Sequence, residues 1–252
     1  MFPRDPKIGA SNFDIGNAID LAVADGCDLL NLSLGGGPLD AVTDEAIKAA
    51  RAAGTVCVIA AGNDAGPVAN PGRHPFAACV SAMGFEGAWP KGAMQDDDIT
   101  RPFGKAKSYI AAFSNTGPEI DLTGPGCGTA RREARRRAGG PNFAVGVRPD
   151  TRPRISRFVA RSGLARLAGG NGMPRFVFRK KAEMTSQGLP ELAERATNLG
   201  AKVLAQTGSM LYVEGSEAMF QALASAAPDY VCAPERKQDV PRPPRVSVKR
   251  SA

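Results

Sequence analysis

The sequence is poor in the residues that build metal sites. Its 252 residues include one histidine and five cysteines, and the cysteines show no metal-ligand spacing. Three of the five fall in apolar strand or helix-end contexts, so we expect buried free thiols and no requirement for an oxidising compartment. The cysteines are Cys27, Cys57, Cys79, Cys127 and Cys232.

Long apolar runs are also missing. No segment approaches the roughly eighteen apolar residues of a membrane span, so we expect no membrane partner. The opening residues, MFPRDPKIGASNF, lack the apolar centre of a signal peptide. Localisation therefore stays unassigned.

Acidic residues form one run, Asp96–Asp98, in a polar excursion that we place between Phe85 and Lys107. Oxygen-rich loops suit calcium, but this run lacks the alternating ligands and the closing glutamate of a calcium loop. We interpret it as a solvated acidic turn. The sequence predicts no metal and no cofactor.

The composition is otherwise that of a globular protein with uneven charge. A hydrophobic content of 43% is enough for an ordinary core, and the net charge is +7. Residues 1–127 look near-neutral or acidic, and the basic excess lies downstream. We therefore divide the chain into a first domain (1–127), an arginine-rich segment (128–172), a small module (173–234) and a basic, proline-rich, disordered tail (235–252).

The strongest local pattern lies in the first quarter of the chain. Two apolar runs of strand length, Leu29–Leu34 and Thr55–Ala61, flank an amphipathic helix. This order predicts a βαβ unit in a parallel sheet with a right-handed crossover. Because ligands bind outside the carboxyl ends of such strands, we expect Ser33–Gly37 and Ala60–Asn63 to line one cleft.

Other elements of the first domain are predicted from the same rules. Asn12–Asp25 should form a helix, and Ala77–Met83, Tyr109–Phe113 and Ile120–Leu122 should form strands. The inward face of the helix is expected to contain Ile15, Ala18, Ile19, Ala22 and Val23.

Four segments of the first domain stand out by their order and separation: LNLSLGG (30–36), VIAAGN (58–63), NPGRHPFAACVSAMG (70–84) and AFSNTGPEIDLTGPG (112–126). Together they resemble the middle of a subtilisin-like serine protease (subtilase) domain. The resemblance covers about residues 7–127. It implies an α/β fold, with a partial subtilisin-like parallel sheet and flanking helices.

The resemblance also implies site residues. One strand, which in the family pairs with the substrate backbone and walls the specificity pocket, corresponds to Ser33, Leu34, Gly35 and Gly36. The opposite wall corresponds to Ala60, Ala61 and Gly62. Asn63 matches the side-chain amide of the family's oxyanion hole, a donor that stabilises the charge of a tetrahedral intermediate. By its own residues, Asn63 could also be a turn residue after glycine.

The sequence departs from the subtilase pattern at the catalytic triad. The family needs an aspartate on an early strand, a histidine opening a helix and a serine in a later Gly-Thr-Ser-Met-like turn. We find none of the three. His74 lies in NPGRHPFA, which matches a surface turn, so we interpret it as structural or solvated. After Gly126 the match stops, and CGTARREARRRAGGPNF replaces the nucleophile turn.

The arginine-rich segment allows three interpretations. It contains eleven arginines against two acids, Glu133 and Asp150, and little periodicity, so we expect disorder. It could be a nucleic-acid-binding arm, a linker, or an out-of-frame stretch of a GC-rich gene. We favour the last, because the family pattern breaks inside a motif. Nucleic acid is not expected as a partner.

The last third predicts a small α+β module. Strands are expected at Arg175–Lys180, Lys202–Gln206, Met210–Glu214 and Tyr230–Ala233, with helices at Leu189–Leu199 and Ser216–Ala226. The first helix should bury Leu189, Leu192, Ala196 and Leu199. The second helix should bury Met219, Phe220 and Leu223. The order βαββαβ is ferredoxin-like. It is similar to that of subtilase propeptides, which implies a protease partner for this module.

We therefore expect a partial subtilisin-like domain whose family chemistry is peptide-bond hydrolysis through a serine acyl-enzyme. Because the aspartate, histidine and serine are missing, the chain as given should be inactive. The substrates of the family are peptides or proteins. The main alternative is a protease-binding, inhibitor or chaperone-type module in the C-terminal part. A truncated or frameshifted gene product is a third possibility.

Overall fold

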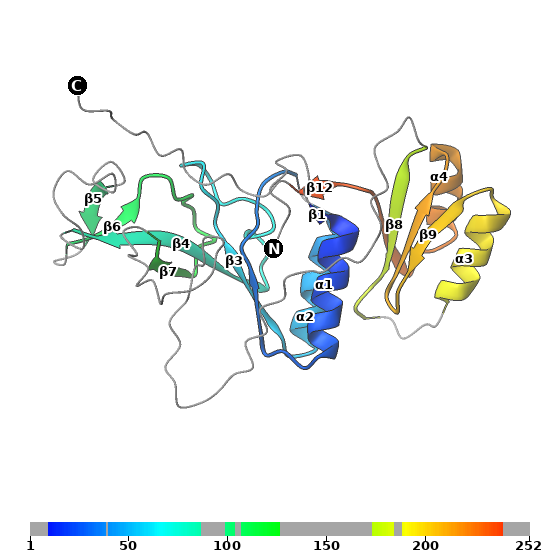
Figure 1. The fold of residues 1–252 in the computed structure, drawn as a ribbon, viewed down its shortest axis with the longest axis horizontal. Helices are drawn as coiled ribbons and strands as arrows, with labels where there is room; N and C mark the ends of the chain where they lie inside the picture. The colour runs from blue at the N-terminus through cyan, green and yellow to red at the C-terminus, as the bar shows by residue number, and fades with distance from the viewer. Residues whose placement is uncertain are drawn as a thin grey trace, which may run out of the picture.

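A computed structural model describes the protein over residues 10–38, 40–86, 99–103, 107–126, 173–183 and 188–238. Within these ranges it contains two larger sheets and two pairs of helices. Figure 1 shows that one helix pair lies between the two sheets, and that the second pair covers the far side of the second sheet. The described part of the chain is therefore built in four layers.

The first sheet combines parallel and antiparallel strands. Its order is β2-β3-β4-β6-β5, with β7 also pairing with β4. β2, β3 and β4 run parallel, as does β7 beside β4, while β5 and β6 form an antiparallel pair. The strands are β2 (Leu29–Leu32), β3 (Val56–Ala60), β4 (Ala77–Phe85), β5 (Ile99–Phe103), β6 (Ser108–Ala111) and β7 (Leu122–Pro125).

The helices α1 (Asn12–Ala24) and α2 (Ala41–Ala52) are well capped. Ser11 and Asp14 form a capping box at the start of α1, and Asp40 accepts two backbone N–H groups at the start of α2. Gly54, with φ of +92°, follows the end of α2 in the left-handed region that favours glycine. Because α2 connects β2 to β3 and these two strands pair in parallel, the predicted βαβ unit is confirmed.

The core of the first domain lies between the helices α1 and α2 and the strands β2 and β3. Its side chains are aliphatic residues at three- and four-residue steps on the helices and on alternate positions of the strands. It contains Ile15, Ile19, Ala22, Cys27, Leu30, Ala46, Ile47, Ala50, Cys57 and Ile59, all buried.

The C-terminal module, residues 173–238 as far as described, has the predicted βαββαβ order. All neighbours in its sheet are antiparallel, in the order β11-β8-β10-β9. Its elements are β8 (Arg175–Lys180), α3 (Leu189–Asn198), β9 (Lys202–Gln206), β10 (Met210–Glu214), α4 (Glu217–Ser225) and β11 (Tyr230–Pro234). The mixed α/β fold with this small α+β module is confirmed.

Both faces of the module's sheet are covered. On β8, Phe176 and Phe178 pack into the core beneath α3 and α4, whereas Val177 belongs to a second cluster with Phe13 of α1 and Val42 of α2. This alternation follows from the two-residue period of a strand. The module therefore rests on α1 and α2 through the sheet face that its own helices leave open (Figure 1).

Several elements differ from their predicted positions. The strand expected at Ile120–Leu122 lies at Leu122–Pro125, and β5 falls inside the predicted polar excursion. Leu199 was predicted to face inward, but it caps α3 and is 49% exposed. Lys237–Gln238, which we assigned to the disordered tail, form β12 and pair with β1 (Ala10–Ser11).

Other predictions fall where the structure gives no description. Asp96–Asp98, Cys127, the arginine-rich residues 128–172 and the tail from residue 239 lie outside the described residues. The four described cysteines are free thiols, and three of them are buried. Among the described residues, no helix has the length and apolar character needed to cross a membrane.

Candidate functional site

The two glycine turns leave the same edge of the first sheet. β2 and β3 pair in parallel, from Leu29 opposite Val56 to Leu32 opposite Ile59. The residues that follow each strand, Ser33–Gly36 and Ala61–Asn63, therefore begin side by side at the carboxyl edge. A cleft at this edge is the usual ligand site of an open α/β sheet.

Gly35 lies close to the backbone of Ala60 and of Asn70. A Cβ atom on Gly35 would lie 3.8 Å from the carbonyl oxygen of Ala60 and 3.7 Å from that of Asn70. The backbone N–H of Gly36 donates to the same Asn70 oxygen, at 2.9 Å. Ser33 is exposed, and its hydroxyl accepts a hydrogen bond from Asn31. Backbone groups therefore dominate this side of the edge.

The turn that contains Asn63 is organised by a second asparagine, Asn115. Its Oδ1 accepts the backbone N–H groups of Asp64 (2.8 Å) and Gly66 (3.1 Å), and its Nδ2 donates to the carbonyl of Ala61 (3.1 Å). Asn115 is 2% exposed, so these bonds are shielded from water. Sequence analysis gave Asn115 no role beyond its place in the family-like segment 112–126.

Gly62 is required for this arrangement. A Cβ atom at Gly62 would lie 2.2 Å from Nδ2 of Asn115, and its φ of +113° is in the left-handed region. Two residues after Asn63, Ala65 also has a positive φ, +53°, and its N–H donates to the carbonyl of Phe113. The half-buried Asn63 thus lies in a turn whose backbone is fixed on both sides by tertiary contacts.

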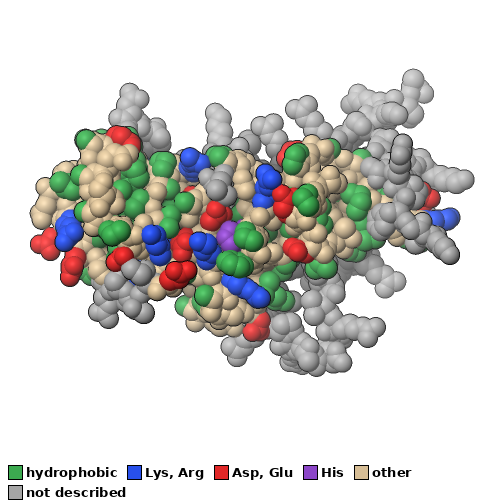
Figure 2. Space-filling model, turned by 180° about the vertical axis from the view of Figure 1, so that it is seen from behind, with side chains coloured by type: hydrophobic (Ala, Val, Ile, Leu, Met, Phe, Trp, Pro, Cys, Tyr) green, Lys and Arg blue, Asp and Glu red, His purple; other side chains and the backbone are tan. Residues whose placement is uncertain are grey.

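His74 lies in a turn before β4. Its Nδ1 accepts the backbone N–H of Phe76 at 3.1 Å, and the two rings are 5.6 Å apart. Burial lowers the pKa of this histidine, and the positive charge of Lys48 lowers it further. Figure 2 shows the single histidine among basic and acidic side chains near the middle of one face. One of the two ring nitrogens, Nδ1, thus accepts a hydrogen bond inside the turn of His74, as expected for a structural histidine.

The module contacts α1 through one buried charge. Arg179 on β8 donates two hydrogen bonds to the carboxylate of Asp20, at 2.9 and 2.6 Å, and Ser209 donates to the same carboxylate. The side chain of Arg179 is 1% exposed and that of Asp20 is 25% exposed. A bidentate arginine–carboxylate pair in this position fixes orientation as well as contact.

A second polar contact holds the strand that leaves the module. Asn12 donates from Nδ2 to the carbonyl of Pro234 and to Oδ1 of Asp40, each at 3.1 Å. Its backbone N–H donates to the carbonyl of Arg236 at 2.8 Å. The chain then pairs with β1, immediately before α1. The start of α1 therefore joins α2, β11 and β12.

A third contact lies on α2. The Oε1 atom of Glu45 accepts the backbone N–H of Ala182 at 2.7 Å, and the other oxygen contacts Lys48 at 3.4 Å. Glu45 is 6% exposed. The interface thus has an aromatic and aliphatic centre with charged and amide groups placed around it, and among these groups the Nε atom of Arg179 is buried without a hydrogen-bond partner in the described part of the chain.

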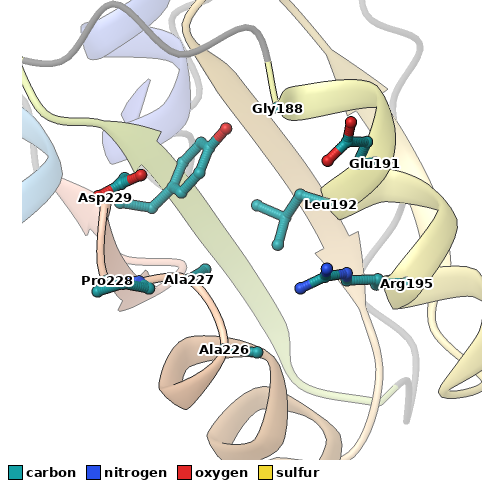
Figure 3. Close-up of a pocket in the computed structure, with 9 residues that line it drawn as sticks. Gly188, Glu191, Leu192, Arg195, Ala226, Ala227, Pro228 and Asp229 are labelled. Atoms are coloured by element: carbon teal, nitrogen blue, oxygen red, sulfur yellow. The ribbon is translucent and has the colours of Figure 1, made fainter.

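A shallow hollow lies elsewhere on the module. It is bordered by Gly188, the N-cap of α3, by Glu191, Leu192 and Arg195 of α3, and by Ala226–Tyr230, as Figure 3 shows. This side of the module is the helical side, away from α1 and α2. The hollow is therefore separate from both the docking surface and the glycine turns. No group of three or more histidine, cysteine, aspartate or glutamate side chains suited to a metal occurs among the described residues.

Comparison with protein families gives a match that runs past Gly126, where we expected the resemblance to stop, and into the arginine-rich segment. The model of the subtilase family matches residues 5–146. A curated relative, the halolysin-like extracellular serine protease Nep of Natrialba magadii, is 35% identical over 119 residues. The match covers 47% of this chain and 18% of the relative, so the chain spans less than a fifth of that protein's length.

Solved structures give partial matches of the same kind. The prenylagaramide maturation protease PagA is 24% identical with a TM-score of 0.37, covering 48% of this chain and 39% of that one. A protease of Pseudoalteromonas arctica is 33% identical with a TM-score of 0.29, covering 39% and 24%. A cold-adapted subtilisin-like serine proteinase is 24% identical with a TM-score of 0.33, covering 44% and 34%.

Proposed function

The chain belongs to the subtilase family, and from this membership we propose that its first half carries the substrate-binding and oxyanion side of a serine endopeptidase site. In this proposal Ser33–Gly36 pairs with the backbone of a peptide or protein substrate, and Ala60–Gly62 forms the opposite wall of the specificity pocket. The observation that supports it is the parallel pairing of β2 and β3, which starts both segments at one sheet edge.

Asn63 has the electrostatic role in this site. Peptide hydrolysis through a serine acyl-enzyme develops negative charge on the former carbonyl oxygen, and the side-chain amide of Asn63 is a suitable donor to that oxygen. A donor of this kind is effective when it is held in place before the reaction begins. The three hydrogen bonds of the buried Asn115 to the turn around Asn63 support that rigidity.

The chain as given does not complete the reaction. Its single histidine has one nitrogen bonded to its own turn, and the sequence contains no Gly-Thr-Ser-Met-like nucleophile turn. Without nucleophile and base, no acyl-enzyme forms. A serine-directed fluorophosphonate probe should therefore leave the protein unlabelled, with an intact subtilisin-like protease as the labelled control. Stoichiometric labelling that one serine substitution abolishes would overturn this proposal.

The docked module favours a second function, in which residues 173–238 act as a prodomain-like partner of a subtilase fold. The module covers α1 and α2 with a whole sheet face, and its outgoing strand β12 pairs with β1. Because α1 runs into β2, its first residues lie toward the carboxyl edge from which the glycine turns leave. A module held there is suited to guide folding or to limit substrate access.

The test of this second function uses the segment 173–238 expressed by itself. Circular dichroism and a cooperative thermal melt first establish whether the segment folds. A folded segment should then slow peptide turnover by an intact subtilisin-like protease at micromolar concentration. A folded segment that leaves turnover unchanged at that concentration would remove the inhibitory role.

A further inference from the structure

One face of α1 carries three residues at four-residue spacing that all contact the module: Asn12, Gly16 and Asp20. We propose that this stripe is the recognition element by which the module selects its partner. The partner it fits is a subtilase-type helix pair that carries a small residue and, one turn later, a carboxylate. This inference rests on the proposed prodomain-like role and names the feature of the partner that the module reads.

The carboxylate of Asp20 is the charged part of the stripe. Arg179 projects from the centre of a sheet and is 1% exposed, so docking removes its guanidinium from water. That transfer is costly unless a well-placed anion receives the charge. Asp20 meets this need with two hydrogen bonds, and Ser209 supplies a third donor to the same group. A helix without this acid would leave Arg179 buried and unpaired.

Gly16 provides the space in which the arginine lies. A Cβ atom on Gly16 would be 3.1 Å from Sδ of Met210 and 3.3 Å from Nη1 of Arg179. A long side chain here would occupy the position of the guanidinium. The small residue and the acid therefore act together, since one makes room for the cation and the other neutralises it.

Asn12 extends the stripe to the strand that leaves the module. It is fully buried, and its side chain bonds both Asp40 of α2 and the carbonyl of Pro234. Its Oδ1 also accepts the backbone N–H of Arg236 at 3.2 Å. One amide thus ties together the helix pair and the end of the module.

The stripe is distinct from the face that α1 uses for its own core. Ile15, Ile19 and Ala22 pack with α2 and the first sheet. Asn12, Gly16 and Asp20 are polar or small, the composition of a helix face that tolerates water. Gly16 and Asp20 contact the module and do not belong to the core of the first half. Changing these two residues therefore leaves that core intact, which makes the stripe testable.

The test is a double-mutant cycle in the full chain with Asp20→Asn, Arg179→Met and the two together. Hydrogen exchange of the Ala182 amide, which is bonded to Glu45 across the interface, reports docking. Asp20→Asn should accelerate this exchange roughly 100-fold, because it leaves the buried Arg179 without its anion. Arg179→Met should accelerate it less, because Asp20 is 25% exposed and keeps the hydrogen bond from Ser209. The increase in exchange rate in the double variant should be smaller than the product of the increases in the two single variants, because the two side chains interact.

Two matched controls lie on the same helix. Asp25→Asn changes an exposed acid at the end of α1 and should leave the exchange unchanged. Gly16→Leu should undock the module, whereas Ala24→Leu, at an exposed position, should not. The amide of Ile59 in β3 serves as the internal reference, because its exchange reports the fold of the first half.

Additive effects in the cycle, or single variants that behave like Asp25→Asn, would overturn the inference. Faster exchange at both Ala182 and Ile59 would also contradict it, because the change would then act on the first half itself. The outcome is independent of the inhibition assay. Coupling without inhibition would leave the recognition stripe standing and remove the prodomain-like role, and inhibition without coupling would do the reverse.

Discussion

The ring of Phe13 on α1 stacks on the ring of Tyr212 on β10, with centroids 4.9 Å apart and planes inclined by 17°. Phe13 is 2% exposed, although it does not belong to the aliphatic core beneath α1 and α2. The stack therefore lies in the interface, and Phe13 is an apolar anchor between the first half and the module.

Replacing Phe13 by alanine should lower the free energy of unfolding by about 3 kcal/mol, because a buried aromatic side chain leaves a cavity between two packed layers. The matched control is Phe76→Ala, since Phe76 is 48% exposed and should change stability by less than about 1 kcal/mol. Urea titration followed by circular dichroism measures both. Equal losses in the two variants would contradict the assignment of Phe13 to the interface.

Asn115→Ala should cost roughly 2–4 kcal/mol, because it leaves two backbone N–H groups and one carbonyl of the Asn63 turn without their buried partner. The amides of Asp64 and Gly66 should exchange faster than those of β3. Asn198→Ala, at an exposed helix end, is the control and should leave these amides unaffected. Unchanged exchange at Asp64 and Gly66 in the Asn115 variant would show that other contacts hold the turn.

Asp44 should make stability fall as the pH rises. Burial, helped by the negative charge of Asp40, raises the pKa of the Asp44 carboxyl from 3.8 to about 6. The folded state therefore holds this proton more tightly than the unfolded state, so the contribution is complete below pH 4 and is lost as the pH rises through 6. Asp44→Asn removes the loss, and its stability relative to the natural protein should grow between pH 4 and 7.

Thermal melts across this pH range test the Asp44 prediction. Other carboxylates titrate in the same range, so the informative quantity is the difference between variant and natural protein at each pH. Asp25→Asn, at the exposed C-cap position of α1, is the control for removing one surface carboxylate. If the curves of stability against pH for Asp44→Asn and for the natural protein run parallel, the pKa of Asp44 is the same in the folded and the unfolded state.

The buried thiols should resist modification. Burial raises the pKa of Cys57 and of Cys79 to about 11, so little thiolate is present at pH 8. Iodoacetamide at that pH should label both only slowly in the native protein and fast in strong denaturant. Peptide mapping by mass spectrometry distinguishes the sites. Fast native labelling of Cys79 would show that β4 opens easily.

The sequence predicts the elements better than it predicts their assembly. The period of the apolar residues was enough for α1, α2 and the βαββαβ order, because each element buries a face that its own pattern reveals. It failed at Leu199, where the helix ends before the pattern does. It also missed the docking, because Asn12, Gly16 and Asp20 have the composition of a solvent-facing stripe.

The site shows the same division. The parallel pairing that starts both glycine turns at one edge follows from the βαβ pattern. The part played by Asn115 does not, because its contacts with Asp64 and Gly66 join positions 51 and 49 residues apart. Similarly, nothing in the strand Arg175–Lys180 distinguishes Arg179 as buried until the partner helix is in place. The roles of Ser33–Gly36 and Asn63 in catalysis remain predictions.

The bond from Asn12 to Pro234 spans 222 positions of the chain. At roughly 5–20 residues per second, a ribosome needs on the order of 10–40 s to add that length, and α1 waits in water for its cover throughout. An apolar stripe would be an aggregation hazard during this interval. On the face of α1 that the module covers, an amide, a glycine and a carboxylate lie beside Phe13, and these three residues are compatible with water until the module arrives. They therefore limit the apolar surface that the nascent chain exposes.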